Sequence, residues 1–256
     1  MTGKRGGRPQ IEVRLRRLSS RFKKLVSISA HQSLIGSLVR HGVAAGVEHS
    51  CTLAQLGDCA TVVDVGANRG QFALIVRDRI PTARIESFEP LPEPARRFRT
   101  VFAQDSMVTL HPVAIGPRRE RATIHISARD DSSSLLPIAA AQSSLFAGTE
   151  EAGIATIEVG PLDAFLDAKA IRAPALLKID VQGFELQALE GCASCIDLFE
   201  WVYVECSFVE LYEGQAFADE VIAWLRERGL KLRGVYNMAY DARGAAVQAD
   251  FLFGRQ

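Results

Sequence analysis

Four acidic residues stand at or just beyond the end of an apolar run, and these are the residues best placed for chemistry. They are Asp64, Glu89, Asp180 and Glu205. Short apolar runs rich in β-branched residues predict buried parallel strands, and ligands of open parallel sheets bind beyond the carboxyl ends of the strands. An ionised carboxylate can accept a proton or several hydrogen bonds, so each of these groups is a candidate for binding or catalysis.

The strand predicted over residues 61–65 leads into a glycine turn, followed by a helix predicted over 71–79. The turn reads Asp64-Val65-Gly66-Ala67-Asn68-Arg69-Gly70. Glycine allows a tight turn and close approach to a ligand, and Asn tolerates a left-handed backbone. The spacing differs from the G-x-G-x-x-G of dinucleotide sites and suits a nucleoside without a pyrophosphate, which favours S-adenosylmethionine over NAD. A glycine turn of another α/β protein is the alternative.

We expect the turn to bind the methionine part of this cofactor through Gly66, Ala67, Asn68 and Gly70. Asp64 would either organise the turn or meet the amino group of the methionine. Glu89 ends the strand predicted over 85–89 and lies 23 residues after Gly66 (89 − 66). A carboxylate at about this spacing commonly binds the two ribose hydroxyls, so Glu89 is predicted to hold the ribose.

Three blocks of the sequence resemble the FkbM family of S-adenosylmethionine-dependent methyltransferases, and two shorter segments at 112–116 and 162–163 are similar to it. The blocks are Val63-Asp64-Val65-Gly66-Ala67-Asn68-Arg69-Gly70, Phe88-Glu89-Pro90 and Leu177-Lys178-Ile179-Asp180-Val181-Gln182-Gly183-Phe184-Glu185. The resemblance covers roughly residues 60–256. It implies methylation of a hydroxyl on a sugar, glycolipid or polyketide, and places Ala114 near the adenine. The family usually shows Glu where this chain has Gln182, so no role is assigned to a carboxylate there.

Transfer of a methyl group from a sulfonium needs in-line placement of the acceptor oxygen and a base for its proton. Asp180, at the end of the strand predicted over 175–180, is the candidate for orienting the acceptor or taking its proton. Glu205, in the strand predicted over 201–206, is a second catalytic candidate on the same rim. The alternative for Asp180 is a helix cap through the N–H of Gly183 or Phe184. Two carboxylates could hold Mg²⁺, but this ion needs more oxygen ligands than the sequence identifies, so no metal ligand is assigned.

Alternating strands and helices that end in a hairpin predict an α/β fold, a Rossmann-like seven-stranded class I methyltransferase sheet with an antiparallel last strand. We divide the chain into a basic, partly disordered arm with an amphipathic helix (1–28), a helical lead-in broken near Gly42 and Gly46 (29–59) and a methyltransferase domain (60–256) with a lid-like insertion near 128–153. The other predicted strands cover 108–114, 120–127, 154–159, 230–240 and 246–254, and the other helices 93–102, 161–168, 184–190 and 217–228. His111 is interpreted as a structural residue and His125 as a solvent-facing one.

Charge is unevenly distributed along this chain of 256 residues with zero net charge. Residues 1–24 carry nine basic side chains and one acid, a net +8 that leaves −8 for the remainder. The basic amphipathic pattern at 11–28 suits peripheral contact with an anionic membrane, or packing on the domain or on a partner chain. Nucleic acid is not an expected partner, because the remainder of the chain has a net charge of −8, whereas binding to phosphates requires a basic surface.

The absence of an apolar run of about 18 residues predicts no transmembrane helix, and no secretory signal is recognised, so a cytoplasmic protein, with membrane contact through its arm, is expected. The five cysteines include one C-x-x-C pair, at 192–195, and are expected to be reduced and packed in the domain. The oligomeric state is not predicted.

The sequence therefore predicts an S-adenosylmethionine-dependent O-methyltransferase for a small-molecule or glycolipid acceptor. A methyltransferase for a nitrogen or carboxylate acceptor remains an alternative. So does a noncatalytic cofactor-binding domain docked to a biosynthetic partner or a membrane. An NAD-dependent oxidoreductase is a further alternative, and the glycine spacing argues against it.

Overall fold

The computed structural model of the protein describes residues 32–255, so the basic arm at 1–28 lies outside the described residues. The lead-in forms the helix α2 (Gln32–His41), the 3₁₀ turn η1 (Val47–His49) and the short helix α3 (Ser50–Leu53). The predicted break near Gly42 and Gly46 is confirmed, and Gly42 has a φ of 66°, a left-handed conformation that glycine adopts at little cost.

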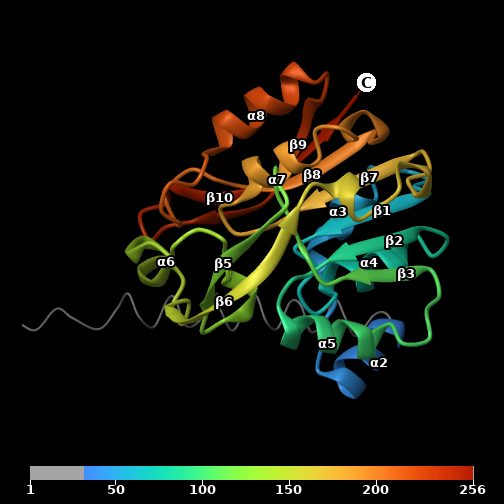
Figure 1. Ribbon diagram of the computed structural model, residues 1–256, viewed down its shortest axis with the longest axis horizontal. Helices are drawn as coiled ribbons and strands as arrows, with labels where there is room; N and C mark the ends of the chain where they lie inside the picture. Colours follow the sequence, from blue (N-terminus) through green and yellow to red (C-terminus); the bar gives the residue numbers. More distant parts are fainter. Residues whose placement is uncertain (1–31, 256) are drawn as a thin grey trace, which may run out of the picture.

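Seven strands form the main sheet in the order β3-β2-β1-β7-β8-β10-β9 (Figure 1). Their bounds are β1 (Thr61–Val65), β2 (Arg84–Phe88), β3 (Val108–His111), β7 (Ala175–Ile179), β8 (Trp201–Ser207), β9 (Lys231–Tyr240) and β10 (Ala246–Gly254). The neighbouring strands β3, β2, β1, β7 and β8 pair in parallel. By contrast, β10 runs antiparallel to both β8 and β9. The predicted seven-stranded Rossmann-like sheet with an antiparallel last strand is therefore confirmed.

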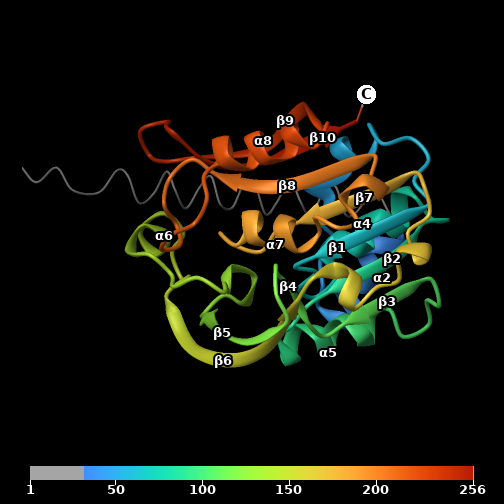
Figure 2. The same cartoon turned by 45° about the horizontal axis from the view of Figure 1, so that its top comes forward.

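Helices cover both faces of this sheet (Figures 1 and 2). On one face α4 (Gln71–Arg79) and α5 (Pro92–Val101) pack with Val62, and on the other α7 (Glu185–Gly191) and α8 (Ala218–Glu227) pack with Val63 and Val65. Successive side chains of a strand point to opposite faces, so a fully buried strand such as β1 contributes to both cores. Each fully buried aliphatic side chain contributes about 1.5–3 kcal/mol to this packing.

A second, three-stranded sheet has the order β4-β6-β5, with β4 (Ala114–Ile115), β5 (Glu120–Ser127) and β6 (Glu151–Gly160). Figure 2 shows β5 and β6 as a curved pair set apart from the main sheet. The single strand predicted over 108–114 is wrong, because it divides into β3 and β4, which belong to different sheets. Pro112 lies at the division, where it cannot donate an N–H to a ladder.

The β5–β6 connection (residues 128–150) contains the 3₁₀ turn η2 (Asp130–Ser132) and the helix α6 (Ala140–Leu145).

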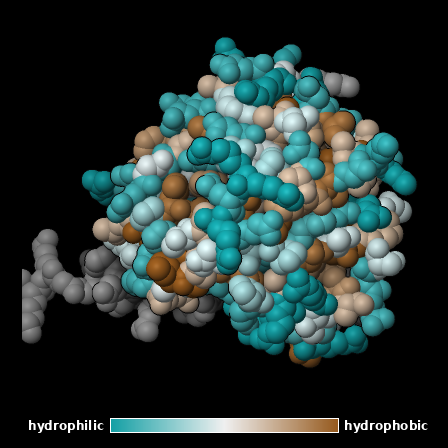
Figure 3. All heavy atoms as spheres, in the orientation of Figure 1, coloured by the Kyte–Doolittle hydropathy of each residue, from teal (hydrophilic) through white to brown (hydrophobic). Residues whose placement is uncertain are grey.

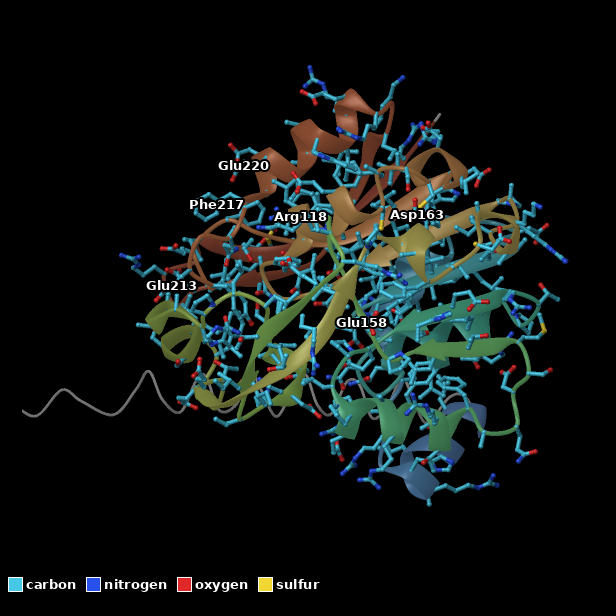
Figure 4. All side chains as sticks on the ribbon, in the orientation of Figure 1. Arg118, Glu158, Asp163, Glu213, Phe217 and Glu220 are labelled. Carbon is cyan, nitrogen blue, oxygen red and sulfur yellow. The ribbon has the colours of Figure 1, made fainter. Side chains whose placement is uncertain are left out.

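The helix predicted over 161–168 is wrong, because the chain forms two 3₁₀ turns there, η3 (Leu162–Ala164) and η4 (Ala168–Ala170). The Asp167 side chain accepts from the N–H of Lys169 and so starts the second turn. A further 3₁₀ turn, η5 (Ile196–Leu198), precedes β8. The predicted start of α8 is correct to one residue, and there the N–H of Phe217 donates to Glu220 at 2.9 Å (Figure 4).

The face of the molecule drawn in Figure 3 is largely polar, with apolar side chains in small scattered groups. No helix within residues 32–255 is long and apolar enough to cross a membrane. All five cysteines are free thiols; Cys51 is exposed and the other four are buried.

Candidate active site

A cavity of about 380 Å³ opens at the carboxyl ends of β1, β2 and β7. This volume lies within the range of about 300–1,000 Å³ that is usual for small-molecule sites. The lining comes from the lead-in, the glycine turn, the residues after β2, the small sheet, the β5–β6 connection and the rim of β7, β8 and β10. Arg69 of the glycine turn forms an ion pair with Asp130, which joins the connection to the turn.

The glycine turn packs its backbone against the end of β7. Gly66 has a φ of 80°, and a Cβ there would overlap the carbonyl oxygen of Asp180, so only glycine fits. The N–H groups of Gly66 and Ala67 both donate to the carbonyl of Phe88 at 3.0 Å. Asn68 has a φ of 46°, and its side chain accepts from the N–H of Arg69 at 2.7 Å. Gly66, Ala67 and Asn68 all line the cavity, as expected from the sequence.

Glu89 also lines the cavity, and two backbone N–H groups hold its carboxylate. One oxygen accepts from Asn68 at 2.9 Å and the other from Leu91 at 2.8 Å. Burial raises the pKa of Glu89 to about 7, although both hydrogen bonds favour the ionised form. Each oxygen keeps a lone pair for a further donor, so the group can accept two hydrogen bonds from a diol.

Asp64 lies beneath the turn and does not line the cavity. Its fully buried carboxylate is 3.1 Å from Nζ of Lys178, which also donates to the carbonyl of Gly66 at 3.1 Å. Burial alone would lower the pKa of Lys178, but the carboxylates of Asp64 and Asp180 raise it above its usual value, so the lysine stays charged. Of the two roles expected for Asp64, this position favours organising the turn.

Gly70 is the N-cap of α4, with a φ of 92°, and it does not line the cavity. A Cβ at this position would lie 2.6 Å from the ring of Phe102 and 3.0 Å from that of Phe98. Gly70 therefore allows α5 to pack close to the start of α4. The sequence motif identified the turn correctly, but this glycine serves packing and backbone conformation, without a direct place in the cavity wall.

Ala114 lines the cavity from β4, although the sequence placed it at the end of a strand in the main sheet. The wall around it is apolar, with Phe88, Leu91, Val113 and Ile115 also contributing. A small residue among apolar neighbours leaves room for a flat ring, so the position expected near the adenine suits that role.

Asp180, Gln182 and Glu205 form the polar rim of the cavity. Nε2 of Gln182 donates to Oδ1 of Asp180 at 2.7 Å and to Oε2 of Glu205 at 3.0 Å. Gln248 of β10 donates to the other Glu205 oxygen at 2.9 Å. Burial and the neighbouring carboxylates raise the pKa of Glu205 well above its usual range. The two strand-end carboxylates predicted as catalytic candidates are thus brought together.

The alternative that Asp180 caps α7 is not what the structure shows. Glu185 instead accepts from the N–H groups of Val181 at 3.2 Å and Gly183 at 3.0 Å, in the loop before α7, and the N-cap of the helix, Phe184, makes no side-chain capping bond. Burial raises the pKa of Glu185 to about 7. The side chain of Asp180 is 36% exposed and faces the cavity.

His49 is a cavity residue that sequence reasoning missed. Its Nδ1 lies 3.0 Å from the hydroxyl of Tyr203 and 3.4 Å from Oδ2 of Asp250. Burial would raise the pKa of Asp250, but hydrogen bonds, that of His49 first, lower it. No sequence pattern signals this cluster, because its members come from the lead-in, β8 and β10.

The two histidines singled out in the sequence lie elsewhere. His111 is 2.9 Å from Glu86 and stacks on Phe88, which agrees with a structural role. His125 pairs with Glu151 at 2.6 Å outside the cavity. Among residues 32–255 no group of three or more His, Cys, Asp or Glu side chains is arranged to hold a metal ion.

The chain matches the methyltransferase FkbM domain over residues 64–232. It is 29% identical over 160 residues to the 2-O-methyltransferase NoeI of Sinorhizobium fredii, a match that covers 60% of this chain and 66% of NoeI, just under two thirds of that protein. It is 24% identical over 208 residues to the methyltransferase sdnD of Sordaria araneosa, covering 72% of this chain and 79% of sdnD.

Two solved structures match over most of their length at low identity. The 1,6-didemethyltoxoflavin-N1-methyltransferase of Burkholderia thailandensis has a TM-score of 0.45 and 10% identity, covering 99% of this chain and 92% of that one. A tRNA (m1A22) methyltransferase homologue of Streptococcus pneumoniae has a TM-score of 0.47 and 10% identity, covering 82% of this chain and 72% of that one.

Proposed function

This chain belongs to the FkbM methyltransferase family, and we propose that it transfers the methyl group of S-adenosylmethionine to a hydroxyl of a sugar, glycolipid or polyketide. The observation that carries the proposal is the shared cavity: Glu89, suited to a ribose, and the Asp180–Glu205 rim, suited to an acceptor, line the same space. A cofactor held by the first would present its reactive end near the second.

The residues of the cavity fit the cofactor. Glu89 offers two fixed oxygens to the ribose hydroxyls, the apolar wall around Ala114 suits the adenine, and Gly66, Ala67 and Asn68 leave room for the methionine part. Asp64 and Gly70 would support this site from behind, through Lys178 and through the packing of α4. When bound, S-adenosylmethionine supplies a methyl group on a positively charged sulfur, which leaves as a neutral thioether.

Asp180 is the group best placed to serve the transfer. Its carboxylate would hold the acceptor hydroxyl in line with the methyl group and take the hydroxyl proton as the new O–C bond forms. Lys178 places a positive charge beside this carboxylate, with its Nζ 3.8 Å from Oδ2 of Asp180. Glu205 would assist by binding the acceptor on the same rim.

The acceptor side of the cavity supports a substrate rich in hydroxyls. Asp131, Ser133, Gln182 and Gln248 are among its polar lining residues. The name of NoeI, a 2-O-methyltransferase, is consistent with a hydroxyl acceptor. We further propose that the β5–β6 connection acts as a lid over the acceptor. We also propose that the protein is cytoplasmic and that its arm at residues 11–28 brings it to a membrane that contains a glycolipid acceptor.

The test is turnover with defined acceptors. The full chain is incubated with S-adenosylmethionine and a panel of methyl glycosides, glycolipids and polyketide alcohols, together with amine and carboxylic acid compounds. Formation of S-adenosylhomocysteine is followed, and mass spectrometry locates the added methyl group. Methylation of a hydroxyl compound is the expected result. Methylation of the amines or acids alone would redirect the proposal to those acceptors, and cofactor binding without any product would favour a noncatalytic domain.

A further inference from the structure

Gln182 has an unusual backbone conformation for its residue type. Its φ is 58°, in the left-handed region that glycine and asparagine adopt more readily, and Gly183 follows with a φ of 94°. Strained backbone of this kind persists where the surroundings hold it, and it concentrates at functional sites. The conformation directs the Gln182 side chain into the rim of the cavity, between Asp180 and Glu205.

The orientation of the Gln182 amide is fixed from both ends. Nε2 faces the two carboxylates, and the Tyr212 hydroxyl lies 2.8 Å from Oε1, sharing its one hydrogen between Oε1 and the carbonyl oxygen of Ser132 at 3.1 Å. The Tyr212 hydroxyl in turn accepts from Gln142 of α6 at 3.2 Å. The ring of Tyr212 reaches this place because Gly183 has no side chain: a Cβ there would lie 2.8 Å from Cβ of Tyr212.

Both hydrogens of the amide nitrogen are used, one on each carboxylate. Nε2 therefore binds Oδ1 of Asp180 and Oε2 of Glu205, and Gln248 binds the remaining oxygen of Glu205. Among the two carboxylates, and within residues 32–255, this leaves Oδ2 of Asp180 as the oxygen without a hydrogen bond, 3.8 Å from Nζ of Lys178. Oδ2 is thus the oxygen available to an acceptor hydroxyl.

Resting on the methyl transfer proposed above, we propose that Gln182 is a positioning residue: its amide ties Asp180 to Glu205 and so turns Oδ2 of Asp180 toward the acceptor. A purely structural role would be served with less strain by a glycine or asparagine at this position. The Gln182 side chain instead lies within hydrogen-bond distance of three partners, which are Asp180, Glu205 and Tyr212.

Other charged groups surround this pair. Lys178 of β7 and Asp64 of β1 lie on one side, Glu185 of α7 on another, and Asp250 of β10 beyond Glu205. A variant of Gln182 leaves all of them in place. A changed titration of Asp180 in such a variant can therefore be assigned to the loss of the amide.

The first experiment needs no acceptor. The side-chain carboxyl groups are labelled with ¹³C and titrated by NMR in the wild type, in Gln182→Met, which keeps the length and removes the donor, and in Gln248→Met as the matched control. The signals are assigned by their loss in Asp180→Asn and Glu205→Gln. Loss of one hydrogen bond to the ionised form should raise the Asp180 midpoint by about one pH unit in Gln182→Met. In Gln248→Met the Glu205 midpoint should move and that of Asp180 much less.

An unchanged Asp180 midpoint in Gln182→Met, or an equal shift in Gln248→Met, would overturn the proposal. If Gln182→Met does not fold, Gln182→Asn replaces it, since asparagine adopts this backbone more readily and its shorter amide cannot reach both carboxylates. On an acceptor that the wild type methylates, both Gln182 variants should lose about 10²-fold in kcat, the usual cost of a misplaced reacting group. The dissociation constant for S-adenosylhomocysteine should stay unchanged.

Wild-type turnover in Gln182→Met or Gln182→Asn would also refute the role of the donated hydrogen bonds. Absence of turnover in the wild type with every acceptor would count against the proposed function, while the NMR titration still decides whether the amide ties the two carboxylates. The failures of the two proposals are therefore distinguishable.

Discussion

The binding of S-adenosylhomocysteine should depend on pH through Glu89. Burial raises the pKa of this carboxyl to about 7, and only the ionised form offers both oxygens to a ribose diol. With this pKa about one tenth of the groups are ionised at pH 6 and about nine tenths at pH 8. Because the ligand's hydroxyls favour the ionised form, binding releases a proton, and affinity should rise by about 10-fold between pH 6 and pH 8.

Glu89→Gln removes this ionisation and places an amide NH₂ against a backbone N–H of Asn68 or Leu91, both of which now donate to the carboxylate. A lost hydrogen bond to a charged group costs about 1–3 kcal/mol, which corresponds to roughly 5–150-fold weaker binding at pH 8. The pH dependence should be lost in the same variant.

Calorimetry with S-adenosylhomocysteine at pH 6, 7 and 8, in two buffers of different ionisation enthalpy, measures both the affinity and the proton released. Glu185→Gln is the matched control, because burial also raises the pKa of Glu185 to about 7, yet this side chain accepts hydrogen bonds from the loop before α7 and does not line the cavity. Its variant should keep the pH dependence. The reasoning fails if wild-type affinity is flat with pH, or if Glu89→Gln retains the wild-type slope.

Three further predictions concern other parts of the molecule. Asp180→Asn should lower kcat by about 10²–10⁴-fold with little change in cofactor affinity; near-normal kcat would end its assignment as base, and lost cofactor binding would move it to the cofactor site. Lys178→Met leaves the buried Asp64 carboxylate without its 3.1 Å partner and should reduce the free energy of unfolding by about 3–5 kcal/mol in urea titrations, with recovery in the Lys178→Met/Asp64→Asn double variant; an unchanged midpoint would contradict the ion pair. Deleting residues 1–24, outside the described residues, should preserve turnover of a water-soluble acceptor and weaken salt-sensitive binding to anionic vesicles; a folded truncation that cannot bind cofactor would refute this division.

Apart from β3 and β4, the strands could be predicted from the sequence, as could the glycine turn and the candidates Glu89, Asp180 and Glu205, because their signals are local. An apolar run of five residues followed by Asp or Glu and a turn identifies a strand end without knowledge of its neighbours. Parallel strands bring their carboxyl ends to one edge, so these acids were expected at one rim and are found there. Gly66 also fits its motif, because its positive φ is a property of the turn itself.

The tertiary structure decided which side of each element a residue faces and which distant segments meet. Asp64 and Gly70 belong to the same motif as Gly66, yet neither lines the cavity. Asp64 pairs with Lys178 of β7, and Gly70 packs against Phe98 of α5.

The partners of the rim also come from distant parts of the chain. Gln182 bridges two carboxylates only because β7 and β8 are neighbours, and Gln248 and His49 reach the cavity from opposite ends of the chain. Contacts between residues so far apart leave no periodic signal, since they form only when the sheet brings its strands together in their final order.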